Sequence, residues 1–469
     1  RLRTVTGVQT CALPISALQL EAQRLQTNQQ YAAAAKLLGE AAQLDADDAG
    51  LQFRWATCLL AETNTSAARK SFQRAADADV LPFRADASIN AAIRSLASEG
   101  AGNRLSLCDA EAAFAAAPAA GIAGDESFFE HVHFNFDGNY RLATNWAEHV
   151  AQLLPDSMAR TAPGGLASQE SCERAMGLSD WNRGRVIASV LARMQLPPLV
   201  TQFNNPVRQE SLQRQLTAIA RRQIQTNAVR QARADFDAAA AQAPGDTFLL
   251  HNYGQFLESI GDRKEALAQY AKIVQVLPHD FNAGLKAGRL LAQLGDLDSA
   301  EGRLRRAAAQ RPTLPDAWFE LGLLLASRTN YQAALDCFER VGRMHPSDVA
   351  CLIYRARMLA KLNRHEEARE LYRQALVLDA NNWNAHLELA EALVVANQPD
   401  EAIREYLAAL RLNPRHAMMR VNLGVMLARQ HRLDEAVQQF EAALQLEPAN
   451  PTAKDYLQQV QARRAREAR

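Results

Sequence analysis

Residues 130–143, EHVHFNFDGNYRLA, form the part of this chain whose residue types suggest chemistry. The stretch places the carboxylate of Glu130 three residues before His133, with His131 between them. Alternate residues of an extended segment face the same side, so His131 and His133 could hold a metal ion together, although no third ligand is evident in the sequence. The remaining interpretations are a structural histidine in a loop and a histidine that acts as a base.

The same spacing resembles the last conserved block of SGNH (GDSL-type) hydrolases, where an acidic residue lies three positions before a histidine and a glycine follows it by five. The resemblance implies that His133 is the general base, that Glu130 orients it and that Gly138 forms the turn into a final helix. A neutral imidazole in such a site takes the proton of a serine, and a carboxylate fixes its tautomer. The family usually has Asp where this chain has Glu130. The stretch SLCDAEAAF, which contains Asp109, resembles the preceding strand and turn.

The serine nucleophile of that family is not identifiable in the sequence. The triplet Gly124-Asp125-Glu126 lies in the wrong place and lacks serine, and no G-x-S-x-G motif occurs. We therefore expect the chain as given not to hydrolyse esters. Residues 5–15, VTGVQTCALPI, resemble a translated sequencing adaptor, so we expect residues 1–15 to be an artefact and the natural N-terminus to be missing.

A strict repeat dominates the rest of the chain. Six consecutive blocks of 34 residues run from Thr247 to Asn450 without an insertion or deletion. Each block has an alanine at one fixed position and an aromatic residue or leucine four residues later, and five of the six have proline near the end. Small residues let two helices approach closely, and the larger side chain fills the space beside them. Such a period indicates one helical hairpin stacked repeatedly.

Each block resembles the tetratricopeptide repeat. In the third block, the positions that this family uses for packing are occupied by Trp318, Leu321, Gly322, Leu325, Ala334 and Phe338. The resemblance implies a mainly α fold, a right-handed superhelical α-solenoid in which the first helix of each repeat lines a concave groove. We expect that groove to be lined by residues at the sixth and ninth positions of the blocks, namely Asn252, Gln255, Lys286, Arg289, Glu320, Leu323, Tyr354, Arg357, Glu388, Glu391 and Asn422.

The repeat pattern also sets the expected domain boundaries. Residues 16–82 read as a first pair of repeats, residues 213–450 as the main array with a degenerate repeat at 213–246, and residues 451–469 as a capping helix. Between the repeats, residues 83–155 read as a partial SGNH-like α/β segment. It is expected to contain a helix at 83–100, a strand at 104–108, a helix or turn at 110–117 and a helix at 140–154. Residues 156–212 read as a helical linker with a helix at 180–194.

Composition limits the classes of partner. The 52 basic and 52 acidic residues balance, so no global field attracts nucleic acid or anionic lipid. No run of about 18 apolar residues suggests a membrane span. The sequence contains no CxxC pair, which predicts free thiols, mostly small core residues, and favours the cytoplasm. These cysteines are Cys58, Cys108, Cys172, Cys337 and Cys351, with Cys11 set aside in the adaptor-like segment.

We therefore expect a protein–protein interaction scaffold that binds a protein or peptide in its groove without a cofactor. One alternative is a fragment of an SGNH-like esterase that uses the repeats as a targeting arm and has lost its nucleophile upstream. A second is the repeat arm of a glycosyltransferase-like protein, by resemblance to O-linked N-acetylglucosamine transferases. That arm would need asparagine at most sixth positions, and only Asn252 and Asn422 comply.

Overall fold

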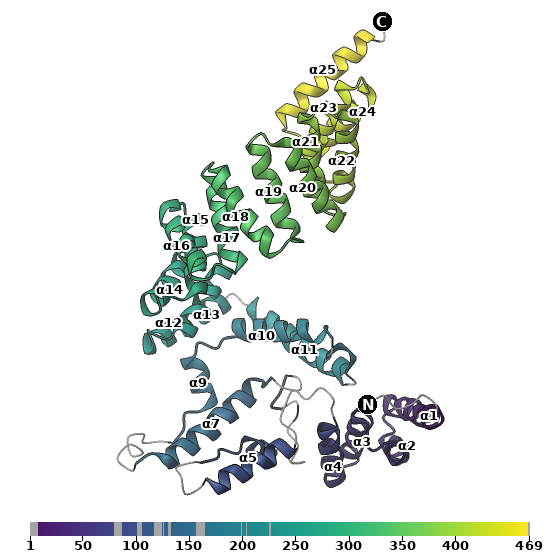
Figure 1. The fold of residues 1–469 in the computed structure, drawn as a ribbon, viewed down its shortest axis with the longest axis vertical. Helices are drawn as coiled ribbons and strands as arrows, with labels where there is room; N and C mark the ends of the chain where they lie inside the picture. The colour runs from purple at the N-terminus through teal and green to yellow at the C-terminus, as the bar shows by residue number, and fades with distance from the viewer. Residues whose placement is uncertain are drawn as a thin grey trace. The chain divides into compact units, whose positions relative to one another are not determined.

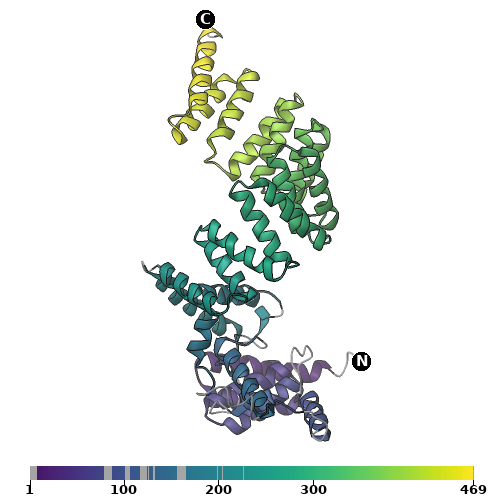
Figure 2. The same cartoon turned by 90° about the vertical axis from the view of Figure 1, so that its left-hand side faces the viewer.

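The structure is a computed structural model that describes residues 8–78, 87–100, 106–116, 124, 126–129, 133–155, 165–197, 199–202, 204–224 and 227–467. It divides into two compact units, Arg1–Ala243 and Pro244–Arg469, and each is described by itself. Helices account for nearly all of the regular structure in both units (Figures 1 and 2). The described residues contain one isolated β-bridge and no strand.

The second unit repeats one helical hairpin six times. The first helices are α13 (Thr247–Ser259), α15 (Phe281–Gln293), α17 (Pro315–Ser327), α19 (Val349–Lys361), α21 (Trp383–Val395) and α23 (Ala417–Arg429). The second helices are α14 (Arg263–Val276), α16 (Leu297–Gln310), α18 (Tyr331–Met344), α20 (His365–Leu378), α22 (Pro399–Leu412) and α24 (Leu433–Leu446). Each helix packs on the next in chain order, so the α-solenoid expected from the sequence is confirmed.

Short polar side chains cap seven of these twelve helices, and a residue with a positive φ follows the first helix of each hairpin. Asp246 accepts the backbone N–H groups of Phe248 and Leu249, and Asp262 accepts that of Glu265, so both cap helix N-termini. The residue two positions beyond each first helix has a positive φ in all six blocks. It is glycine in two blocks, and the other four residues are Thr329, Asn363, Asn397 and His431.

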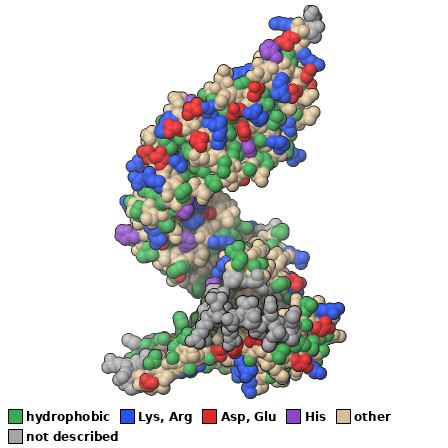
Figure 3. Space-filling view, turned by 45° about the vertical axis from the view of Figure 1, so that its right-hand side comes forward, with side chains coloured by type: hydrophobic (Ala, Val, Ile, Leu, Met, Phe, Trp, Pro, Cys, Tyr) green, Lys and Arg blue, Asp and Glu red, His purple; other side chains and the backbone are tan. Residues whose placement is uncertain are grey.

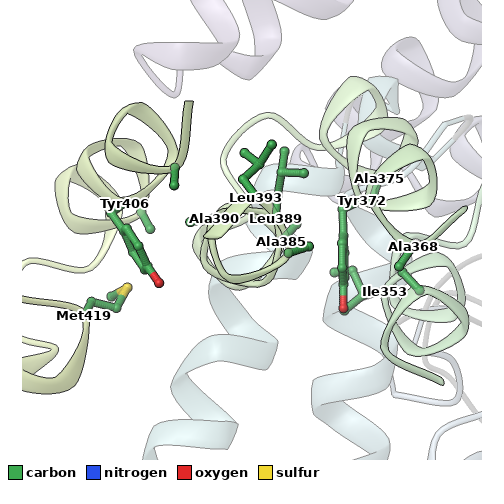
Figure 4. Packing of buried hydrophobic residues seen from close by; sticks show 14 of the residues in the cluster. Ile353, Ala368, Tyr372, Ala375, Ala385, Leu389, Ala390, Leu393, Tyr406 and Met419 are labelled. Atoms are coloured by element: carbon green, nitrogen blue, oxygen red, sulfur yellow. The ribbon is translucent and has the colours of Figure 1, made fainter. Parts of the chain in front are cut away.

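Close approach between the two helices of a hairpin depends on one small residue. In four blocks it is glycine, and a Cβ built there would lie within 2.7–2.8 Å of the large residue sixteen positions later. The other two blocks have Ala356 and Ala390 at this position, and both are fully buried. Figure 4 shows Tyr372 and Tyr406 on opposite sides of α21, the helix that carries Ala390. Alanine and the larger partner thus contribute to one core cluster whose buried members run from Ala300 to Val460.

The last helix, α25 (Pro451–Glu467), covers the end of the array. It buries Ala453 and Val460, and Tyr456 stacks on Phe440 of α24 with ring centroids 5.8 Å apart. Arg464 pairs with Asp434 at 2.8 Å. A helix thus occupies the described part of residues 451–469, the range in which the sequence predicts a capping helix.

The first unit begins with two more hairpins. They consist of α1 (Val8–Thr27) with α2 (Tyr31–Leu44), and α3 (Ala49–Ala61) with α4 (Thr65–Asp77). The recurring alanines Ala34 and Ala68 are fully buried, as the repeat spacing predicts. Residues 8–15, which resemble the adaptor, continue as helix into the following residues, and their interpretation as an artefact stays a prediction.

Residues 83–155 contain helices where helices were expected, but the predicted strand is wrong. The helices are α5 (Ala87–Glu99), α6 (Ala110–Ala116) and α7 (Phe136–Leu153). Ser106–Cys108 are not a strand, because no neighbouring strand in the described part of the chain offers a hydrogen-bonding edge. Their side chains bind α7 instead: Ser106 Oγ lies 2.8 Å from His149 Nε2, and Cys108 Sγ donates to Asn145 Oδ1 at 2.8 Å. Residues 104 and 105 lie outside the described residues.

The remaining helices of the first unit are α9 (Gln169–Ala175), α10 (Asp180–Met194), the 3-10 helix η1 (Leu199–Thr201), α11 (Asn205–Gln223) and α12 (Ala228–Gln242). Helix α10 has the bounds predicted for it. Helix α11 begins before the expected degenerate repeat and packs mainly on α10, through Leu212 and Ile219. Phe236 and Ala239 of α12 are buried, in agreement with the repeat spacing.

Candidate binding groove

First helices of three successive hairpins form most of the wall of an open pocket of about 540 Å³ in the second unit. Because helix positions three and four apart share a face, one face of each first helix contributes. The pocket is lined by His251 and Gln255 of α13, by Asn282, Leu285, Lys286 and Arg289 of α15, by Pro315, Asp316, Phe319 and Glu320 of α17, and by Val341, Asp348 and Ala350. In the space-filling view, acidic and basic side chains lie interspersed over this unit (Figure 3).

The carboxylate of Glu258, on α13, forms ion pairs with both Lys286 and Arg289, the lysine and the arginine of the pocket lining. Lys286 Nζ lies 2.9 Å from Glu258 Oε1, and Arg289 Nη2 lies 2.5 Å from Glu258 Oε2. The hydroxyl of Tyr270, on α14, donates to Oε1 of the same carboxylate at 2.6 Å. Burial raises the pKa of Glu258, but these donors and positive charges outweigh it, so its pKa lies below that of an ordinary glutamate. Glu258 is therefore a carboxylate shared between two neighbouring repeats.

A second ion pair repeats this chemistry three hairpins further along, between the fourth and fifth blocks. Arg357 of α19 donates to Glu388 Oε1 of α21 from Nε at 3.0 Å and from Nη2 at 2.5 Å. Tyr372 of α20 donates to Glu388 Oε2 at 3.0 Å. A tyrosine of a second helix and a cation of a first helix thus converge again on one glutamate. These hydrogen bonds hold the side chains of Arg357, Tyr372 and Glu388 in fixed positions between adjacent repeats.

Aromatic rings fill the face between these two ion-pair groups. Tyr354 of α19 stacks on Phe338 with centroids 5.4 Å apart and meets Phe319 edge-on at 5.3 Å. Phe319 also lines the pocket, so one ring belongs both to the core and to the candidate groove. Leu323 packs partly buried against the same core.

The structure brings together four of the residues predicted to line the groove: Gln255, Lys286, Arg289 and Glu320 share the pocket. Among the others, Arg357 and Glu388 pair with each other, and Asn422 hydrogen-bonds Tyr406. The prediction considered only the sixth and ninth positions of each block. It therefore left out lining residues at the second and fifth positions, such as Asn282 and Phe319. These lie one helical turn away on the same face, so the 3.6-residue period carried the signal. Asn252 and Glu391 stay predicted groove residues.

The histidine that suggested chemistry lies in the first unit. His133 is exposed, and its Nε2 lies 3.3 Å from Arg193 Nη1 of α10. Glu130 and His131 lie outside the described residues, so the proposed base pair and the metal pair both stay predictions. Gly138 lies in the first turn of α7, where its N–H donates to Asn135 Oδ1 at 2.8 Å, consistent with a turn into a helix.

The aromatic residues around His133 have structural partners. Phe134 stacks on Phe128 at 4.6 Å and lies 5.0 Å from Phe114 of α6. Phe129 is buried in the core that α10 and α11 form. The aromatic-rich stretch thus anchors this segment to two neighbouring parts of the first unit.

Two models of known protein families match parts of the array. One tetratricopeptide repeat model matches residues 285–341 and 387–451, and a second matches residues 318–379. These blocks are tetratricopeptide repeats. The constant helix bounds extend the same tetratricopeptide repeat hairpin to the block at residues 247–280. Comparison with curated proteins gave no match.

Several solved structures are similar to parts of the chain. MamA from Desulfovibrio magneticus RS-1 is 23% identical, with a TM-score of 0.35, and the match covers 36% of this chain and 97% of that one. A tetratricopeptide repeat protein from Parabacteroides merdae is 17% identical, with a TM-score of 0.41, and the match covers 51% and 94% of the two chains. YrrB, described as having an unusual peptide-binding site, is 20% identical, with a TM-score of 0.30, and the match covers 47% and 96%.

No described helix is both long enough and apolar enough to span a membrane. No group of three or more His, Cys, Asp and Glu side chains with metal-site geometry occurs among the described residues. Cys58, Cys337 and Cys351 are buried free thiols, and Cys108 and Cys172 are free and partly buried.

Proposed function

We propose that the tetratricopeptide repeats of residues 247–450 act as a scaffold that holds a peptide segment of a partner protein against their first helices. Proteins of this repeat class bind protein partners, and a stack of helical hairpins buries its own core while leaving the faces of its first helices open. The observation that carries the proposal is the pocket of about 540 Å³ between α13, α15 and α17. Its lining combines apolar, aromatic and charged side chains, as peptide-binding grooves do.

Several features favour this site over the rest of the array. Residues of four successive repeats line the pocket, so an extended or helical segment can contact several of them in succession. Internal ion pairs hold Lys286 and Arg289 in place, which reduces the entropy lost on binding. The exposed side chain of Asn282 lies in the lining without contributing to the core.

The proposal can be tested by filling the pocket. We expect short peptides, selected from a displayed random library on the whole chain, to bind the unmodified protein and to lose binding to Asn282→Trp, because the indole occupies the pocket. Gln438→Trp is the matched control, since Gln438 is exposed on the second helix α24 and outside the pocket lining. Circular dichroism checks that both variants are folded. Equal binding to Asn282→Trp and to the unmodified chain would place the peptide elsewhere and refute the proposal.

A further inference from the structure

We propose that the occupant of the pocket between α13, α15 and α17 is a basic segment, in which a lysine or arginine side chain of the partner ion-pairs with Glu320. This inference rests on the proposed function, because it assumes that the pocket holds a peptide. It follows from which charges of the pocket are already compensated within the chain and which are not.

The cations of the pocket are already occupied. Lys286 and Arg289 both ion-pair with the carboxylate of Glu258, at 2.9 and 2.5 Å. An acidic peptide would have to compete with an intramolecular carboxylate held by a further hydrogen bond from Tyr270. Recruiting either cation would leave Glu258 partly buried with less compensation, which costs free energy. The pocket is therefore a poor receptor for an additional anion.

The carboxylate of Glu320 is in the opposite situation. It is partly buried in the pocket lining, and within the described part of the chain it has no hydrogen-bond or ion-pair partner. Burial raises the pKa of Glu320 and the charge of Asp316 adds to this, while Arg289 acts in the opposite direction. A partly desolvated carboxylate without a partner is a group that a cation from outside would stabilise.

The neighbours of Glu320 suit the rest of a basic side chain. Asp316, one turn earlier on α17, is exposed in the lining and adds a second negative charge. Phe319 and Leu285 offer an aromatic and an aliphatic surface. The methylene stem of lysine or arginine packs on such surfaces while its charged end reaches a carboxylate, and a guanidinium also interacts with an aromatic face. Asp348 caps α19, so its carboxylate is already used by backbone N–H groups.

The same imbalance recurs further along the array. Arg357 is taken up by Glu388, and Glu391 lies one turn after Glu388 on α21 without a hydrogen-bond or ion-pair partner among the described residues. Glu391 is exposed; desolvation by its neighbours raises its pKa and the charge of Glu388 adds to this, while Arg357 and Lys361 oppose the shift. Two uncompensated carboxylates on first helices of the third and fifth blocks fit a segment with more than one basic residue.

The experiment sorts the peptides selected from a displayed random library by charge. We expect the peptides enriched on the unmodified chain to be rich in lysine and arginine relative to the starting library. A synthetic copy of an enriched peptide should bind about tenfold more weakly to the double variant Glu320→Gln, Glu391→Gln, because its cations lose their partners. The matched control is Glu370→Gln, Glu441→Gln, which removes the same charge from exposed positions on second helices and should leave binding unchanged.

The outcomes separate this inference from the proposed function. Enriched peptides that are acidic or uncharged, and that still lose binding to Asn282→Trp, would overturn the basic partner while leaving the groove as the binding site. An equal loss of binding in the control pair would show a general charge effect and would also overturn it. Peptides whose binding survives Asn282→Trp, or a library that yields no enrichment, would count against both.

Discussion

Gly322 of α17 lies directly against the ring of Phe338 on α18: a Cβ built on Gly322 would come within 2.8 Å of two ring carbons. The same relationship joins Gly254 to Tyr270 at 2.7 Å and Gly424 to Phe440 at 2.7 Å. A methyl group at this position requires the ring or the helix to shift. Ala356 and Ala390 show that the fold accepts the methyl group in two of its repeats.

We expect Gly322→Ala to lower the free energy of unfolding by about 1–2 kcal/mol, because overpacking a filled core costs more than the gain in helix propensity. Gly302→Ala is the control: nothing lies within 4 Å of a Cβ at that helical position. Its stability should rise by up to about 1 kcal/mol. Urea unfolding followed by circular dichroism measures both. A stabilised Gly322→Ala would show that the close approach is not limiting.

Thr329 adopts a φ of 59° at the end of α17, where two other blocks have glycine. A β-branched residue is strained in this left-handed conformation, so Thr329→Gly should raise the free energy of unfolding by about 1 kcal/mol. Asn363→Gly, at the equivalent position with φ 62°, should gain less, since asparagine tolerates this region. Thermal unfolding of the two variants provides the comparison. An equal or larger gain for Asn363→Gly would contradict the expected difference.

Glu258 contributes pH-dependent stability. Its pKa is lowered in the folded state, so the stabilisation is present above the pKa of an unfolded glutamate and is lost as pH falls through the folded value. Glu258→Gln should therefore cost about 1–2 kcal/mol at neutral pH, and the difference from the unmodified chain should disappear in acid. Urea unfolding across a pH series tests this. A difference that stays constant with pH would assign the effect to packing instead of charge.

Glu320 should show the opposite sign. Its pKa is raised in the folded state, so it favours folding below the pKa of an unfolded glutamate, and this contribution is lost as pH rises through the folded value. Glu320→Gln, which resembles the protonated form, should therefore stabilise the chain at neutral pH by up to about 1 kcal/mol. The gain should vanish in acid. A variant less stable than the unmodified chain at neutral pH would show that the carboxylate has a compensating partner.

Gly138 is required at the start of α7. A Cβ at this position would lie 2.0 Å from the backbone oxygen of Ser127, which itself accepts the N–H of Asn135. Gly138→Ala should push the start of α7 away from the backbone of Ser127 and expose both to solvent. We expect this to lower the free energy of local unfolding by about 2–3 kcal/mol. Faster amide hydrogen exchange at residues 127–129 and 133–139, with unchanged exchange in residues 247–450, is the expected result. Unchanged exchange in both of these short ranges would contradict it.

Much of the helical architecture was predictable because its signals are local. The block length, the positions of Ala334 and Phe338, and the stop near the end of each block follow from residues within one hairpin. The strand expected at residues 104–108 failed for a complementary reason. A strand depends on a neighbour elsewhere in the chain, and Ser106 and Cys108 instead bind side chains of α7.

The sequence by itself determined the tetratricopeptide repeat period, the block boundaries and the face of each first helix, because a 34-residue repeat fixes both helical phase and nearest-neighbour packing. Only the tertiary structure decided which charges on that face remain available. Glu258 forms ion pairs with Lys286 and Arg289 of the following hairpin. Glu388 pairs with Arg357 of the preceding hairpin. Glu320 has no such partner among the described residues. Those pairings depend on how adjacent hairpins pack and on the rotamers of long side chains, and neither is fixed by the spacing of residues along the chain.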